Sequence, residues 1–211
     1  MSTGRAYCRG PVKRVLDVSF SLVALLILAP VLLILALAVL LTSGRPVLFV
    51  HERVGMDGRP FRLVKFRTMH RAAAFGLPLT GSGDSRVTRI GRFLRAAKLD
   101  ELPQLVNVLR GEMSLVGPRP EMPRYVARYT VEERRVLEAR PGLTDPASVL
   151  FRDEEALLGS VRAERREAFY LKTVLPKKLR MNLEYIDRAG MAYDLVLILK
   201  TIRALAWPAR S

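Results

Sequence analysis

The segment LDELPQLVNVLRGEMSLVGPRPE, residues 99–121, contains the side chains best suited to phosphate chemistry. Asp100 and Glu101 lie near its start, and Arg119 lies near its end between two prolines. A guanidinium in a proline-restricted loop can present its planar fork to phosphate oxygens. A carboxylate at a helix start is favoured by the helix dipole and by free N–H groups, which also attract a neighbouring anion. The pattern indicates an anion site, although an acidic first turn taken alone is more typical of ordinary helix capping.

A helix is expected to position Asp100. The spacing i, i+3, i+4, i+7 predicts one apolar stripe that packs in a core, formed by Leu102, Leu105, Val106 and Leu109. Three polar side chains fall on the opposite face: Asp100, Gln104 and Asn107. A proline in the first helical turn, Pro103, is compatible with this helix, and Gly111 is a natural C-terminal stop.

Two motifs, Asp-Glu-Leu-Pro-Gln at 100–104 and Met-Ser-Leu-Val-Gly-Pro-Arg-Pro at 113–120, resemble those of the bacterial sugar transferases, the monotopic phosphoglycosyl transferases. Members of that family transfer a phosphosugar from a UDP-sugar to a polyprenol phosphate, such as undecaprenyl phosphate, at the start of surface glycan biosynthesis. The resemblance implies that Asp100 attacks the β-phosphate, forms a covalent aspartyl phosphosugar and releases UMP. It also implies a Mg²⁺ ion held through Asp100, with Glu101 placing the metal or the incoming phosphate.

The same resemblance implies which residues bind the substrate phosphates: Lys65 and Arg67 in the motif Lys-Phe-Arg-Thr-Met, Arg95, and the loop residues Pro118, Arg119 and Pro120. The residues alone leave other interpretations open. Lys65 and Arg67 could lie on one solvated strand face. Basic residues also recur every three positions along a probable helix, and they could face water or lipid headgroups: Arg86, Arg89, Arg92, Arg95 and Lys98. Where the family has glutamine before Glu-Arg-x-Gly, this chain has His51, to which we assign no catalytic role from the sequence.

An almost unbroken apolar run covers residues 18–41, about 24 residues or ~36 Å as a helix, which is enough to cross a bilayer. Pro30 lies near its middle and is expected to bend it. Basic residues flank both ends, so both flanks favour the cytoplasmic side. Charge counting leaves a spanning and a re-entrant helix open. The resemblance implies the re-entrant form, although Ala29-Pro30 replaces the family's Ser-Pro pair.

The remaining sequence predicts a mainly helical α+β protein. Residues 47–69 read as a β-hairpin turning at Asp57-Gly58, and residues 140–148 as a tight loop. After Gly190 an amphipathic helix is expected, either packed in the core or lying in the bilayer interface. The expected organisation is a membrane re-entrant helix at 1–44 and a catalytic domain with interfacial helices at 45–211, on the cytoplasmic face of the inner membrane.

The charge balance of 35 Lys+Arg against 20 Asp+Glu, a net +15, points to a polyanionic partner. Anionic lipid headgroups and a phosphorylated substrate fit the 50% hydrophobic content. The competing classes are a membrane-anchored nucleic-acid binder, for which no helix-turn-helix, RNP or zinc-finger signature is present, and a non-catalytic lipid-binding scaffold. We therefore expect no nucleic acid partner, and the sequence leaves a homodimer open. The single cysteine, Cys8, excludes an internal disulfide.

Overall fold

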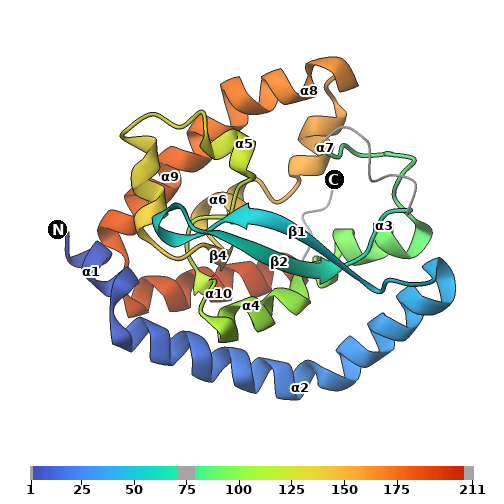
Figure 1. The fold of residues 1–211 in the computed structure, drawn as a ribbon, viewed down its shortest axis with the longest axis horizontal. Coiled ribbons are helices and arrows are strands. Elements are labelled where there is room, and N and C mark those ends of the chain that lie inside the picture. The colour runs from blue at the N-terminus through green and yellow to red at the C-terminus, as the bar shows by residue number, and fades with distance from the viewer. Residues whose placement is uncertain (1, 71–78, 207–211) are drawn as a thin grey trace.

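The computed structural model describes residues 2–70 and 79–206 and is a mainly helical α+β fold with two small sheets (Figure 1). Its helices are α1 Thr3–Arg9, α2 Pro11–Ser43, α3 Arg89–Ala96, α4 Leu105–Arg110, α5 Pro123–Val126, α6 Pro146–Leu150, α7 Glu154–Gly159, α8 Ala163–Phe169, α9 Leu175–Arg188 and α10 Met191–Ala206. Its strands are β1 Leu48–Val54, β2 Pro60–Phe66, β3 Ser114–Val116 and β4 Gly142–Thr144.

Helix α2 extends the predicted apolar run at both ends and contains Pro30 within it. It is long and apolar enough to cross a membrane by length and composition. Figure 1 shows it curving along one side of the molecule, and a proline inside a helix bends it because a backbone hydrogen bond is lost. The bend predicted from Pro30 therefore agrees with the observed curvature.

Both halves of α2 pack on the same globular body. In the first half, Arg14 donates to the carbonyl oxygens of Val108 and Leu109 at 2.6 and 2.8 Å. In the second half, Leu35 and Val39 are buried with Phe66 of β2 and Leu94 of α3. The division into parts 1–44 and 45–211 stays a prediction, because these contacts join the helix to the rest of the chain along much of its length.

The predicted hairpin is confirmed. Strands β1 and β2 pair antiparallel from Leu48 opposite Phe66 to Val54 opposite Pro60. The turn contains Asp57 and Gly58, both with positive φ (57° and 76°), a conformation that asparagine, aspartate and glycine tolerate best. On the inner face, Phe61 and Leu63 pack against Val108 and Met113. The hairpin is thereby joined to the segment that follows Asp100.

The predicted helix around Asp100 is wrong in its first turns. Residues Leu99–Gln104 form a 3-10 turn, and α-helix begins only at Leu105. On the polar face, Asn107 is fully buried against β2. Its Oδ1 accepts from the Val64 N–H at 3.1 Å, and its Nδ2 donates to the Arg62 carbonyl at 2.7 Å. These bonds satisfy backbone groups at the free edge of β2, which explains why an amide side chain is buried at this position.

A second sheet was not predicted. Strands β3 and β4 pair parallel, Ser114 opposite Gly142 and Val116 opposite Thr144, so residues 142–144 form a strand and not a simple loop. At this crossing Gly117 lies so close to Arg140 that a Cβ would meet its carbonyl oxygen at 2.3 Å. Glycine is therefore required at the point where the Pro118–Pro120 loop leaves the sheet.

The main core lies beneath α9, where Tyr125, Tyr170 and Tyr185 are almost fully buried. The expected amphipathic helix after Gly190 is confirmed as α10, and several of its apolar side chains are exposed, including Leu195, Leu199, Ile202 and Leu205. An exposed apolar series also follows α2, namely Phe20, Leu22, Val23, Leu26, Ile27, Leu33, Ile34, Leu37 and Leu41. Exposed apolar faces on two helices are typical of a membrane-contacting surface.

Asn107 tests how the hairpin is fastened to α4. Replacing it in Asn107→Leu should lower the free energy of unfolding by about 2–4 kcal/mol, because buried backbone groups of β2 lose their partners. Chemical denaturation of the detergent-solubilised protein measures the loss. Arg110→Ala, an exposed position in the same helix, is the matched control and should change stability by less than about 0.5 kcal/mol. Equal stability of both variants would contradict the role assigned to Asn107.

Candidate active site

Asp100 lies in the 3-10 turn between α3 and α4 and is only 4% exposed. The turn begins at Leu99, directly after Lys98, whose φ of 54° redirects the chain at the end of α3. Among residues 2–70 and 79–206, no side chain or backbone group hydrogen-bonds or ion-pairs with its carboxylate. A buried carboxylate without a partner is unfavourable for folding alone, so its oxygens are free for another group.

Three cations surround this carboxylate. Lys65 on β2, Arg95 on α3 and Lys98 each favour its charged form. Burial and the neighbouring charge of Glu101 act in the opposite direction and dominate, so the pKa of Asp100 is raised above its usual range. Burial likewise lowers the pKa of Lys65, although the Asp100 charge opposes this. The structure thus brings together Asp100, Lys65 and Arg95, as the sequence predicted.

Glu101 and Arg119 form a direct ion pair. Both terminal nitrogens of Arg119 reach the carboxylate, with Nη1 to Oε2 at 3.3 Å and Nη2 donating to Oε1. Burial opposes the charge on Glu101, but the guanidinium outweighs it and lowers the pKa of Glu101 to about 2. The Glu101 charge in turn raises the pKa of Arg119. Of the two adjacent carboxylates, Glu101 is thus neutralised by Arg119, whereas Asp100 has no ion-pair partner in the described ranges.

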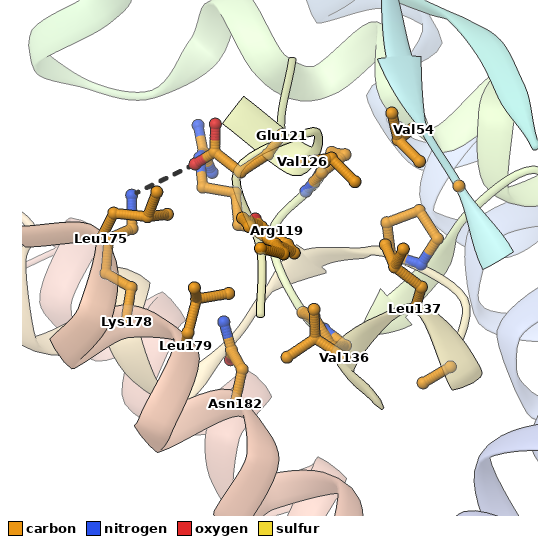
Figure 2. A pocket seen from close by; sticks show the side chains of 16 residues that line it. Val54, Arg119, Glu121, Val126, Val136, Leu137, Leu175, Lys178, Leu179 and Asn182 are labelled. Atoms are coloured by element: carbon orange, nitrogen blue, oxygen red, sulfur yellow. Dashed lines mark ion pairs between the residues drawn. The ribbon is translucent and has the colours of Figure 1, made fainter. Parts of the chain in front are cut away.

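The loop that carries Arg119 is clamped on two sides. The Pro118 carbonyl accepts from Gly142 N–H at 2.9 Å, and the Glu121 carbonyl accepts from Val54 N–H at 3.0 Å. Figure 2 shows Arg119 and Glu121 facing the pocket between this loop and α9, with the Glu121–Lys178 ion pair of 4.0 Å drawn as a dashed line. Tyr170 also donates to the Glu121 carboxylate. Hydrogen bonds on both flanks therefore restrict the loop in addition to Pro118 and Pro120.

Arg53 is a site residue that the sequence interpretation missed, counting it only as a flanking charge. It lies within 3.6 Å of the Glu121 carboxylate and donates to the Pro120 carbonyl at 3.4 Å. Its Nε is buried without a hydrogen-bond partner in the described chain, and the same holds for Nη1 of Arg95. The predicted hairpin could have indicated its position. Once the two strands are paired about the Asp57-Gly58 turn, Arg53 on β1 and Lys65 on β2 project to the same face.

The remaining predicted phosphate-binding residues have partners of their own. Arg67 donates through Nη2 to the carbonyl oxygens of Ser43 and Gly44, which stabilises the C-terminal end of α2. Its Nε and Nη1 are buried with no partner in the described ranges, so a phosphate contact by Arg67 stays a prediction. Arg95 reaches Glu155 at 3.3 Å and Thr80 at 3.2 Å. Helix α3, which carries Arg95, packs closely on the backbone at Thr68. Only glycine fits at Gly91, because a Cβ there would lie 2.1 Å from the Thr68 carbonyl oxygen.

The donor set suits a magnesium ion shared with a ligand. Within the described ranges no three His, Cys, Asp or Glu side chains gather as an all-protein metal cage. Mg²⁺ is usually held by one or two carboxylates together with substrate phosphates and water. Asp100, a carboxylate with no hydrogen-bond or ion-pair partner in the described ranges, fits this mode, and Glu101 is the adjacent second carboxylate. Magnesium at Asp100 stays a prediction.

Comparison with known proteins gives consistent matches. The family model described as "Bacterial sugar transferase" matches residues 8–208. The chain is 40% identical over 205 residues to the UDP-glucose:undecaprenyl-phosphate glucose-1-phosphate transferase of Caulobacter vibrioides, covering 92% of this chain and 69% of that protein. It is 36% identical to the enzyme of the same name from Escherichia coli K12, covering 90% and 39%. It is 34% identical to the UDP-N-acetylgalactosamine-undecaprenyl-phosphate N-acetylgalactosaminephosphotransferase of Aeromonas hydrophila, covering 92% and 43%.

The Glu101–Arg119 pair predicts a pH-dependent stability. Because the pKa of Glu101 is about 2 in the folded protein and 4.5 in its ordinary state, the pair stabilises the fold fully above pH 4.5 and progressively less as pH falls towards 2. At pH 7 we expect Glu101→Gln to be about 1–3 kcal/mol less stable than the natural protein. Denaturation should show the same gap at pH 7 and pH 5 and a smaller gap at pH 3. An exposed control, Glu164→Gln, should show no gap, and a Glu101 gap that stays constant with pH would contradict the assignment.

Proposed function

Because the chain belongs to the bacterial sugar transferase family, we propose that it transfers a sugar-1-phosphate from a UDP-sugar to undecaprenyl phosphate and so initiates synthesis of a surface polysaccharide. The observation that carries the mechanism is Asp100, a buried carboxylate near the positive charges of Lys65, Arg95 and Lys98. It makes no hydrogen bond or ion pair with the part of the chain that the structure describes. The relatives named above act on UDP-glucose or UDP-N-acetylgalactosamine, so the sugar is left to experiment.

In the first step an oxygen of Asp100 attacks the β-phosphorus of the UDP-sugar. The bond between that phosphorus and the bridging oxygen breaks, and UMP leaves with the bond's electron pair. The product on the enzyme is an aspartyl phosphosugar. Lys65 and Arg95 stabilise negative charge as it develops on the phosphate oxygens, and Arg119 binds the departing nucleotide phosphate.

In the second step a phosphate oxygen of undecaprenyl phosphate attacks the phosphorus of the aspartyl phosphosugar. The bond to the Asp100 oxygen breaks, which restores the carboxylate and forms the undecaprenyl diphosphosugar. Both nucleophiles are anions approaching an anion, so charge neutralisation governs each step. A Mg²⁺ ion bound through Asp100 and the substrate phosphates would supply part of that neutralisation, and Glu101 would place the metal or the incoming phosphate.

The location we propose is the cytoplasmic face of the inner membrane, with α2 re-entrant. The support is that Arg14 near its start and Val39 near its end both contact one globular body. A straight spanning helix would carry its two ends to opposite sides of the bilayer. The exposed apolar faces of α2 and α10 would then lie in the lipid, which brings the site close to the headgroups where the lipid substrate's phosphate resides.

Asp100→Asn should abolish the covalent phosphosugar adduct and reduce transfer by roughly a thousandfold or more, because an amide cannot act as the nucleophile. A panel of UDP-sugars, each assayed for transfer to undecaprenyl phosphate with Mg²⁺ and with a chelator, identifies the sugar, and intact-protein mass spectrometry detects the adduct.

Since burial and Glu101 raise the pKa of Asp100, the rate should fall on acidification at a higher pH than for an ordinary aspartate.

The control for this experiment is Asp153→Asn, an exposed carboxylate of the same type that makes no side-chain bond in the described chain. It should keep the natural rate and form the adduct. Turnover near the natural level in Asp100→Asn would exclude Asp100 as the nucleophile. Absence of transfer from every UDP-sugar would overturn the proposed function itself.

The re-entrant arrangement predicts that Thr3→Cys and Arg45→Cys, exposed positions on either side of α2, react from the same side. In spheroplasts both should resist a membrane-impermeant maleimide, and after lysis both should react. The natural Cys8 gives little background, because burial leaves it 2% exposed and raises its pKa to about 11. Labelling of one position from outside while the other stays protected would establish a spanning helix.

A further inference from the structure

His51 lies on β1 in a row of side chains that faces the site. Alternation along a strand puts Phe49, His51 and Arg53 on one face, and the pairing places Lys65, Leu63 and Phe61 directly opposite them. At one end of the row Lys65 interacts with Asp100, and at the other Arg53 contacts the loop that carries Arg119. His51 therefore lies between the nucleophile and the arginine loop.

The imidazole of His51 is held in place but not satisfied. It stacks on Phe49 with ring centres 5.3 Å apart and an interplanar angle of 27°. Its Nδ1 is buried and has no hydrogen-bond partner within residues 2–70 and 79–206. Nε2 also makes no bond to a described residue, but it is not sealed from the surroundings as Nδ1 is. A packed ring with two unused nitrogens has hydrogen-bonding capacity available for a ligand.

The charges around His51 determine its protonation. Burial, followed by the positive charges of Arg53, Lys65 and Arg119, lowers the pKa of His51 to about 3, with Glu101 acting weakly in the opposite sense. The ring is therefore neutral at physiological pH. Because Nε2 is the nitrogen that is not sealed, an anion can reach only this side of the ring, and binding it requires the hydrogen on Nε2 and the lone pair on Nδ1.

We propose that His51 is a substrate-binding residue whose Nε2–H donates to a phosphate oxygen of the nucleotide sugar's diphosphate. The inference rests on the proposed function, and it adds a residue that lies outside the acidic pair and the arginine loop. A diphosphate that reaches from Asp100 to Arg119 passes the middle of the β1 row, where His51 lies. The neighbouring cations attract the anion, and the neutral imidazole supplies direction without adding another buried charge.

Two substitutions separate this role from a structural one. A glutamine amide, like the neutral imidazole, is an uncharged N–H donor on a side chain of comparable reach. A purely structural ring stacked on Phe49 would be replaceable by an aromatic residue without a donor. The two roles therefore predict different outcomes for His51→Gln and His51→Phe.

The test is steady-state kinetics with the UDP-sugar identified by the substrate panel. His51→Phe, which keeps the stack and removes the donor, should raise the KM for the UDP-sugar about tenfold and leave the KM for undecaprenyl phosphate unchanged. His51→Gln should recover most of that loss. The other histidine, His70, is exposed, and His70→Gln is the matched control that should keep both constants. Unchanged UDP-sugar KM in His51→Phe, or an equal rise for both substrates with no recovery in His51→Gln, would overturn the proposal.

A spectroscopic measurement gives an answer that does not depend on turnover. In the His70→Gln protein His51 is the single histidine, so ¹⁵N imidazole spectra at pH 7 report it alone. UDP is added to saturation in the presence of Mg²⁺, and saturation is judged by the thermal stabilisation of the protein. The Nε2 resonance should then shift while the ring stays neutral. A saturated protein with an unshifted Nε2 would refute the contact. Failure of sugar transfer with a shifted Nε2 would instead reject the proposed reaction and keep His51 as a diphosphate ligand.

Discussion

Two adjacent carboxylates in a shielded site repel each other, and the ion pair between Glu101 and Arg119 resolves that repulsion in this protein. With Glu101 neutralised by a bound guanidinium, Asp100 is left as a carboxylate that no described residue hydrogen-bonds or ion-pairs. The environment acts on the two acids in opposite directions, raising the pKa of Asp100 and lowering that of Glu101. Neighbouring residues of similar chemistry thus acquire different roles from their surroundings alone.

This separation depends on scaffolding that reaches far along the chain. Arg119 is positioned because its loop is clamped to β1 through Val54 and to β4 through Gly142. Asp100 is positioned because Asn107 fastens the following helix to the edge of β2. Helix α2 joins the same body at both halves, through Arg14 and through Val39, so the long apolar helix and the charged site belong to one packed unit. An enzyme that transfers a phosphosugar from a water-soluble nucleotide sugar to a lipid needs this proximity.

The features that the sequence predicted correctly are local. Asp57-Gly58 determines the hairpin because its backbone angles suit few other residues, and the apolar run around Pro30 determines a long bent helix. The features it failed to predict depend on partners distant in the chain. Strands β3 and β4 are three residues each, too short for alternation to be recognised, and they exist only because they pair with one another. The residues Leu99–Gln104 have the apolar spacing of a helix, but spacing alone does not distinguish a 3-10 turn from an α-helix. Packing against the rest of the chain decides between these two hydrogen-bond patterns.

The sequence by itself determined the family, through motifs long enough to be specific, and it predicted Asp100, Glu101 and Arg119 as the central site residues. Only the tertiary structure decided that Glu101 is held by Arg119 while Asp100 is unpartnered, since linear spacing carries no information on which cation meets which acid. It also decided that Arg67 stabilises the end of α2, and that His51 and Arg53 face the site. The physical reason is that register and burial, which set the charge of each group, arise from contacts between segments far apart in the chain.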